Sequence, residues 1–271
     1  MAMASSSSGG GADAGRPPLP VPAPALSSGK AMPRVGFGTA TATLGQAESR
    51  AAVAEAVLRA LDAGYRHFDT AAVYGTEAAV RDAAAEAVRA GAIASRDELF
   101  VTSKLWATDA HPGRVIPALH KTLQVEVHPY CRQKKVREFC RAKGIQLCGY
   151  SPLGGKGTAW GNDLVMDSPV LKQIAQDRGR TIAQVCIRWV YEQGDCVIVK
   201  SFNEKRMREN LDIFDWELTD DDRRKIDELP ESRGNYDMFV HESGPYKTAD
   251  ELWDGEIATG KSKESALISS E

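Results

Sequence analysis

The sequence predicts an α/β fold of the (β/α)8 TIM-barrel type that is incomplete, with about six of the eight barrel strands present. Short apolar strands alternate with amphipathic helices, a pattern typical of a parallel sheet with right-handed crossovers. The first three strands begin near residues 35, 66 and 99. They are about 32 residues apart, the length of one unit in a barrel of ~250 residues. Six units of that length fill the span from Pro33 to Leu229, so two are missing.

Three strand–helix units occupy the N-terminal half. Their strands are expected at Val35–Gly38, Arg66–Asp69 and Leu99–Ser103. Apolar residues at helical spacing mark the helix that follows each strand. These are Val53, Val57, Ala60 and Leu61, then Val80, Ala84 and Val88, then Val115, Leu119 and Leu123. Gly64 is expected to end the first helix as its C-cap.

Three further strands are expected at Val125–His128, Ile145–Gly149 and Val197–Val199. Apolar positions mark a helix after each of the first two strands: Val136, Phe139 and Cys140, then Ile182, Val185, Cys186 and Trp189. Two helices close the barrel. Thr219 is the expected N-cap of the second, because three aspartates follow it and their charges suit a helix N-terminus.

Composition bounds the domain organisation. Residues 1–31 are rich in Ser, Gly, Ala and Pro and are expected to form a disordered tail. Residues 32–271 form one domain, which ends in a loop over residues 230–271. The net charge is -3 without a basic block, and no apolar run is long enough to span a membrane. We therefore expect no nucleic-acid or membrane partner, and the sequence predicts no specific protein partner.

The five cysteines are odd in number and lack the paired spacing of metal ligands. This pattern indicates buried thiols in a reducing compartment. We expect no bound metal and a cytoplasmic location.

A proton-handling cluster is expected where two neighbouring strands end. Asp69 ends the second strand, Tyr74 lies in the loop after it, and Lys104 ends the third. Active sites of barrels lie at the C-terminal ends of their strands, so these three side chains can converge. An ammonium group close to a phenol favours its ionised form, and a buried carboxylate would hold that ammonium in place. The alternative is a structural Asp69–Lys104 ion pair with Tyr74 as an unrelated aromatic residue.

An anion site is expected after the last strand. Lys200 and Ser201 follow that strand, and Arg206 and Asn210 share one face of the next helix. A lysine, a hydroxyl and an arginine around a helix N-terminus suit a phosphate group. The alternative is a solvated basic turn.

The chain resembles the aldo-keto reductase family in several motifs, which occur in family order. These are Met32–Thr39, Phe68–Ala71 with Tyr74 and Glu77, Val101–Trp106, Gln124–Pro129, Tyr150–Gly154, and Ile198–Ser201 with Arg206, Glu209 and Asn210. The segments Gly244–Thr248 and Glu251–Gly255 are similar to a plant subgroup of the family.

The resemblance implies an enzyme that uses NADPH to reduce a small-molecule ketone or aldehyde. It makes Tyr74 the proton donor, with Asp69 and Lys104 as its catalytic partners. It also implies that Tyr150 stacks on the nicotinamide and that Gln124 holds the carboxamide. Thr39, Lys200, Ser201, Arg206 and Asn210 complete the cofactor-binding residues, the last four around the adenosine 2′-phosphate.

The sequence departs from the family after its third helix. The fourth strand, which carries the catalytic histidine, and the fifth, which carries a Ser-Asn pair, are absent, with a junction near residues 123–125. Gln124 could then belong to the end of the third helix. If strand Val125–His128 paired with strand Leu99–Ser103, His128 would stand beside Lys104. Loss of the strand that carries the histidine is expected to impair the reduction. The alternatives to a reductase are a non-catalytic nucleotide-binding relative and an unstable splice-variant fragment.

Overall fold

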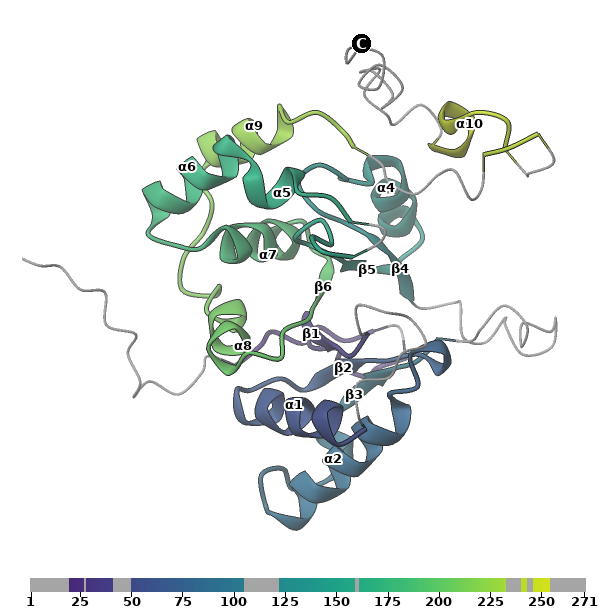
Figure 1. Ribbon diagram of the computed structural model, residues 1–271, viewed down its shortest axis with the longest axis vertical. Helices are drawn as coiled ribbons and strands as arrows, with labels where there is room; N and C mark the ends of the chain where they lie inside the picture. The colour runs from purple at the N-terminus through teal and green to yellow at the C-terminus, as the bar shows by residue number, and fades with distance from the viewer. Residues whose placement is uncertain are drawn as a thin grey trace, which may run out of the picture.

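The protein is represented by a computed structural model that describes residues 20–26, 28–40, 50–104, 122–158, 161–232, 240–242 and 246–253. Within these ranges six parallel strands form one sheet in the order β3-β2-β1-β6-β5-β4 (Figure 1). The strands are β1 (Val35–Gly38), β2 (His67–Asp69), β3 (Phe100–Thr102), β4 (Thr122–Glu126), β5 (Gln146–Tyr150) and β6 (Cys196–Val199). The predicted incomplete barrel is confirmed.

Helices pack on one face of this sheet (Figure 1). They are α1 (Arg50–Asp62), α2 (Glu77–Arg89), α4 (Lys134–Ala142), α5 (Leu164–Asp167), α6 (Pro169–Arg178), α7 (Ile182–Glu192), α8 (Glu204–Leu211) and α9 (Asp220–Asp227), with short 3-10 turns η1 (Ala72–Tyr74) and η2 (Arg96–Glu98). A further helix, α10 (Ala249–Trp253), stands apart from the sheet. Figure 1 shows β1–β3 with α1 and α2 in the lower part, and β4–β6 with α4–α7 in the upper part. No helix in the described ranges is long and apolar enough to cross a bilayer.

Sequence capping signals fix several helix ends. Thr219 caps α9 in a reciprocal capping box with Asp222, as predicted, and Thr181 does the same for α7 with Gln184. Gly64 lies just after the end of α1, where the sequence predicted a glycine to end the helix. Its φ of 107° is in the positive range that favours glycine. Asn203 caps α8, where its side chain accepts a hydrogen bond from the backbone N–H of Arg206.

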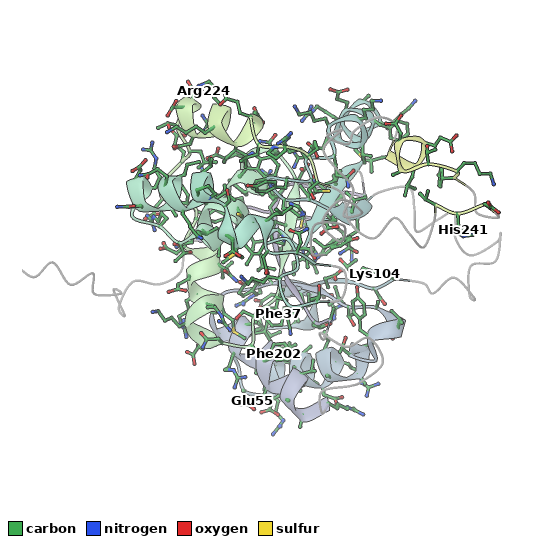
Figure 2. All side chains as sticks on the ribbon, turned by 45° about the horizontal axis from the view of Figure 1, so that its top comes forward. Phe37, Glu55, Lys104, Phe202, Arg224 and His241 are labelled. Atoms are coloured by element: carbon green, nitrogen blue, oxygen red, sulfur yellow. The ribbon has the colours of Figure 1, made fainter. Side chains whose placement is uncertain are left out.

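The sheet has an apolar core on each face. Alternate strand residues such as Phe37, Phe68 and Val197 pack under the helices in the larger cluster, where Phe37 also stacks on Phe202 at 6.4 Å between ring centroids (Figure 2). The residues between them face the barrel interior. There a smaller cluster contains Met32, Cys148, Cys196 and Ile198. All five cysteines are buried thiols outside any disulfide.

Gly36 is required on the interior face because strands approach closely there. A Cβ at this position would lie 2.7 Å from Cδ1 of Ile198 and 2.9 Å from Nδ1 of His67. Both atoms belong to neighbouring strands, which would have to move apart. The glycine therefore allows β1 to lie between β2 and β6 at this close spacing.

The sheet curls until its far strands face each other. Four strand spacings separate β2 from β4, which would be roughly 19 Å in a flat sheet. Yet Nε2 of Gln124 on β4 lies 3.1 Å from Oδ1 of Asp69 on β2. Such a contact is only possible across the interior of a curved sheet.

The fourth predicted strand is displaced. It was expected at Val125–His128, but β4 spans Thr122–Glu126 and pairs in register with β5 from Thr122↔Gln146 to Glu126↔Tyr150. Leu123 and Gln124 therefore lie in a strand, and the alternative that Gln124 ends a helix is wrong. The segment expected to form the third helix, residues 105–121, lies outside the described residues.

The alternative in which β4 pairs with β3 is wrong. In the described part of the chain β3 pairs with β2 alone and β4 with β5 alone, so each is an edge of the sheet. His128 lies beyond β4 and forms an isolated bridge with Cys131. It therefore lies in the connection between β4 and α4, and without the β3–β4 pairing the reason to place it beside Lys104 is gone.

Ordered contacts begin earlier than the predicted tail boundary at residue 31. Ala25 bridges Ala31 in antiparallel fashion, and the backbone N–H of Arg34 donates to the carbonyl of Pro22 at 2.9 Å. Residues 1–19 lie outside the described part of the chain. So does most of the predicted C-terminal loop, of which residues 230–232, 240–242 and 246–253 are described.

Candidate active site

The Asp69–Lys104 pair lies at the C-terminal ends of β2 and β3. Nζ of Lys104 donates to both carboxylate oxygens of Asp69, at 2.8 and 2.7 Å, and to the carbonyl of Thr70 at 3.1 Å. Asp69 is buried, while the side chain of Lys104 is 30% exposed at the rim (Figure 2). Burial raises the pKa of Asp69, and the charge and hydrogen bonds of Lys104 and Gln124 oppose that rise.

Tyr74 lies on the other side of the lysine. It ends η1, five residues after Asp69, and its ring centroid is 4.8 Å from Nζ of Lys104. The ammonium group therefore touches a carboxylate and an aromatic ring at once. The structure brings together the three residues that the sequence predicted to converge.

A chain of threonine hydroxyls supports this corner. Oγ1 of Thr39 donates to the backbone carbonyl of Asp69 at 2.9 Å and lies 2.7 Å from Oγ1 of Thr76. Thr76 in turn lies 2.8 Å from Oγ1 of Thr70. All three side chains are buried. Thr39 therefore joins β1 to β2 beneath the site, and its contact with a cofactor stays a prediction.

Thr70 and Thr76 were missed by sequence reasoning. Both are small polar residues next to a strand end and a helix start, a place where buried hydroxyls commonly satisfy backbone groups. Two threonines, one directly after Asp69 and one two residues after Tyr74, were the available signal.

Gln124 points into the same site from the opposite wall. Its amide Nε2 donates to Oδ1 of Asp69 at 3.1 Å, and the residue is half-buried. The amide therefore meets the carboxylate of the ion pair. The carboxamide contact implied by the family resemblance stays a prediction.

Tyr150 and Glu126 form the rim beside Gln124. Tyr150 ends β5 and is 39% exposed, as an aromatic platform for a flat ligand would be. Burial of its hydroxyl, and then the charge of Glu126, raise the pKa of Tyr150 to about 12. The phenol is therefore neutral at physiological pH, and its stacking on a nicotinamide stays a prediction.

His128 is a buried structural residue in this fold. Its Nδ1 accepts a hydrogen bond from the backbone N–H of Tyr130 at 3.2 Å, and its Nε2 lies 3.5 Å from Oε1 of Glu126. Both ring nitrogens thus have partners within the β4–α4 connection. Among the described residues, Lys104 contacts Asp69, Thr70 and Tyr74.

The connection between β6 and α8, the β6–α8 corner, carries the basic residues that the sequence predicted there. Nε of Arg206 donates to Oγ of Ser201 at 3.3 Å, and Oγ of Ser201 accepts from the backbone N–H of Asn203 at 3.2 Å. Nζ of Lys200 lies over the ring of Phe202, 4.4 Å from its centroid. Lys200, Ser201 and Arg206 therefore surround the N-terminus of α8.

Asn210 lies apart from these three. It is buried one turn along α8 and hydrogen-bonds the hydroxyl of Tyr65, which also donates to the carbonyl of Met207 at 3.1 Å. Its place among the phosphate-binding residues stays a prediction. Asn203 and Phe202, which shape the corner, were not among the predicted site residues. The N-cap preference of asparagine before Glu204 was the signal for the first of them.

Residues 34–124 and 120–231 match the model of the aldo/keto reductase family. The two matched pieces overlap at residues 120–124, where β4 begins. Deoxymugineic acid synthase 1-B of Triticum aestivum is 47% identical over 308 residues, which cover 83% of this chain and 97% of that protein. The (1S)-1,7-diacetoxy-luvungin A aldo-keto reductase of Citrus sinensis is 41% identical over 312 residues, covering 85% and 96% respectively.

A solved structure is similar as well. The aldo-keto reductase of Bombyx mori in complex with NADP superposes with a TM-score of 0.68 at 26% sequence identity, over 77% of this chain and 92% of that chain. The chain therefore belongs to the aldo/keto reductase family. Both plant alignments are longer than this 271-residue chain although they use only part of it. The relatives thus contain residues that have no counterpart here, as the six-stranded sheet requires.

Proposed function

We propose that this protein binds NADPH in the cytoplasm and reduces the carbonyl group of a small-molecule ketone or aldehyde to an alcohol. The observation that carries the proposal is the position of Nζ of Lys104. It lies within hydrogen-bond distance of both oxygens of Asp69 and 4.8 Å from the ring centroid of Tyr74. This arrangement suits a tyrosine that donates a proton to a developing alkoxide.

The residues present fit the phosphate of such a cofactor. Among the described residues neither Lys200 nor Arg206 forms a salt bridge, and both lie at the N-terminus of α8. Two cations without a neutralising carboxylate, next to the positive end of a helix, favour a doubly charged anion. Lys200, Ser201 and Arg206 would hold the 2′-phosphate, and Tyr150 would support the nicotinamide.

The proton is handled by the chain itself. NADPH supplies the hydride for the carbonyl carbon when it is bound. Tyr74 donates its hydroxyl proton to the carbonyl oxygen, and the charge of Lys104 stabilises the phenolate that remains. Asp69 keeps that ammonium group fixed through two hydrogen bonds.

Nucleotide binding without turnover is the second candidate function. Two observations favour it: the described residues form six strands, two fewer than a complete barrel has, and Gln124 is engaged with Asp69. The family resemblance assigns to one missing strand the histidine that accompanies Tyr74. Binding and turnover therefore have to be measured separately.

The test is a fluorescence titration of the purified full-length chain with NADPH, with Arg206→Ala as the variant. Loss of a charge-assisted contact to a phosphate is expected to raise Kd about tenfold or more. Arg208→Ala is the matched control. It removes an arginine from the same helix, where it pairs with Asp62 and Glu204 on the surface.

Tight binding that is weakened only by Arg206→Ala supports the cofactor site. Equal affinities in both variants, or no saturable binding by the unmodified chain, would refute it. Turnover of a generic aldehyde by the binding-competent protein then separates a reductase from a protein that only binds the nucleotide.

A further inference from the structure

Asp69 receives a third hydrogen bond that comes from the opposite wall of the curled sheet. Lys104 supplies two of its bonds, and Nε2 of Gln124 supplies the other at 3.1 Å to Oδ1. Lys104 follows the neighbouring edge strand, whereas Gln124 lies on β4 at the other end of the strand order. The carboxylate is thus held from two sides of the interior.

We infer that Gln124 is a positioning residue, which holds the Asp69 carboxylate in the orientation that grips Lys104 beside Tyr74. This inference rests on the proposed function, because it concerns the same proton-donating group. The role differs from a contact with the nicotinamide carboxamide, because the amide Nε2 of Gln124 donates to Asp69. A primary amide has two N–H donors and one acceptor, so the contact uses one of three sites.

The geometry explains why such a support is needed. The side chain of Lys104 is 30% exposed, and the described chain beyond it offers no further strand next to β3. A long side chain at an open edge loses rotamer entropy when it is ordered. A second donor already holds the Asp69 carboxylate in one orientation. Formation of the ion pair then costs the conformational entropy of Lys104 and little of that of Asp69.

The electrostatics favour the same assignment. Burial raises the pKa of Asp69, and the hydrogen bond from Gln124 acts against that rise together with Lys104. Without the amide, protonation of Asp69 becomes easier and the grip on Lys104 weakens. The other titratable groups that face this pair are Tyr74 beyond the lysine, His67 on β2, and Cys196 on β6.

The experiment compares Gln124→Met with Gln146→Met in the full-length chain. Methionine keeps the length of the side chain and removes the donor. Gln146 lies on the adjacent strand and donates to the carbonyls of Leu147 and Gly194, away from the site. Carbon-13 NMR of labelled aspartate carboxyl groups follows the titration of Asp69 in each protein. We expect the Asp69 pKa to rise in Gln124→Met and to stay unchanged in Gln146→Met.

Kinetics supply the second readout. In Gln124→Met, kcat/KM for carbonyl reduction is expected to fall about tenfold, as for loss of a hydrogen bond to a charged group. The acid limb of its pH profile should move to higher pH, while Kd for NADPH stays within about twofold of the unmodified chain. A rise in Kd that accounts for the whole loss would overturn the inference, because Gln124 would then act on the cofactor.

A second variant tests the same contact with the shape of the side chain unchanged. Gln124→Glu has the same shape and places a carboxyl group against Asp69, so it is expected to raise the Asp69 pKa further than Gln124→Met does. An unchanged Asp69 titration in the folded variants would refute the contact. If the unmodified chain neither binds NADPH nor reduces an aldehyde, the proposed function fails, while the NMR titration still decides the role of Gln124.

Discussion

At the scale of single residues, Lys104 and Tyr74 make separable contributions. Lys104 contacts the Asp69 carboxylate and the ring of Tyr74, whereas the phenol hydroxyl of Tyr74 is the group that gives up a proton. Tyr74→Phe keeps the ring above the ammonium and removes the proton. Lys104→Met keeps the chain length and removes the charge that stabilises the phenolate.

We expect both substitutions to lower kcat for carbonyl reduction by a factor on the order of 100 or more, the usual worth of a positioned general acid. NADPH affinity, measured by fluorescence, should change little. Tyr130→Phe is the control, because it removes a buried hydroxyl that donates to Ser168 and not to a residue of the Asp69–Lys104–Tyr74 cluster. Full activity in Tyr74→Phe would show that another group supplies the proton.

At the scale of the elements, the sequence placed the strand ends well. The alternation of strands with helices located β2 and β3, and parallel strands end at one edge of a sheet, so the convergence of Asp69, Tyr74 and Lys104 could be predicted. The β6–α8 corner followed from the same rule, with Arg206 in the first turn of the helix.

Other features depended on contacts that no local pattern records. Leu123 suits a helix face and a strand equally, so the start of β4 was placed three residues too late. The Gln124–Asp69 bond depends on the curvature of the whole sheet, because the two residues are four strands apart in its order. The buried threonine chain was missed because isolated hydroxyls carry no periodic signal.

His67 on β2 contacts β3, β6 and the segment before β1 on the interior face of the sheet. Its Nδ1 lies 3.0 Å from the carbonyl of Pro33, its Nε2 lies 2.9 Å from Oγ1 of Thr102, and Cys196 is 3.6 Å away. A carbonyl can only accept, so Nδ1 carries the proton and Nε2 accepts from the threonine. Protonation of Nε2 would break that bond inside a buried site.

Burial lowers the pKa of His67 from 6.5 to about 4. The folded protein therefore binds this proton less readily than the unfolded chain does. This pKa difference contributes about 3 kcal/mol to the free energy of unfolding. The contribution is fully present above about pH 6.5 and is lost as the pH falls through 4. In His67→Gln, we expect urea unfolding between pH 7 and 4 to lose this part of the pH dependence. An unchanged pH dependence would mean that His67 titrates normally in the folded state.

At the scale of the whole molecule, the consequence of six strands is two edges. In the described residues β3 and β4 each pair on one side, whereas β1 and β6 pair on both and join the two parts of the sheet. Paired neighbours on both sides protect a strand from local opening, and edge strands open at lower free energy. The stability of the molecule should therefore be highest in its centre and fall toward both edges.

Amide hydrogen exchange followed by mass spectrometry or NMR measures this gradient. We expect the amides of β1 and β6 to exchange slowest, and those of β3 and β4 at least tenfold faster, since about 1.4 kcal/mol of local opening energy corresponds to that factor. Addition of NADPH should slow exchange in the first turn of α8 and at the end of β5, where Arg206 and Tyr150 lie. Equal protection across all six strands would show that the edges are covered in solution and that the shortened barrel unfolds as one unit. Fast exchange in β1 and β6 as well would show that the loss of two units has removed the stable centre, and with it the frame that holds Asp69 against Lys104.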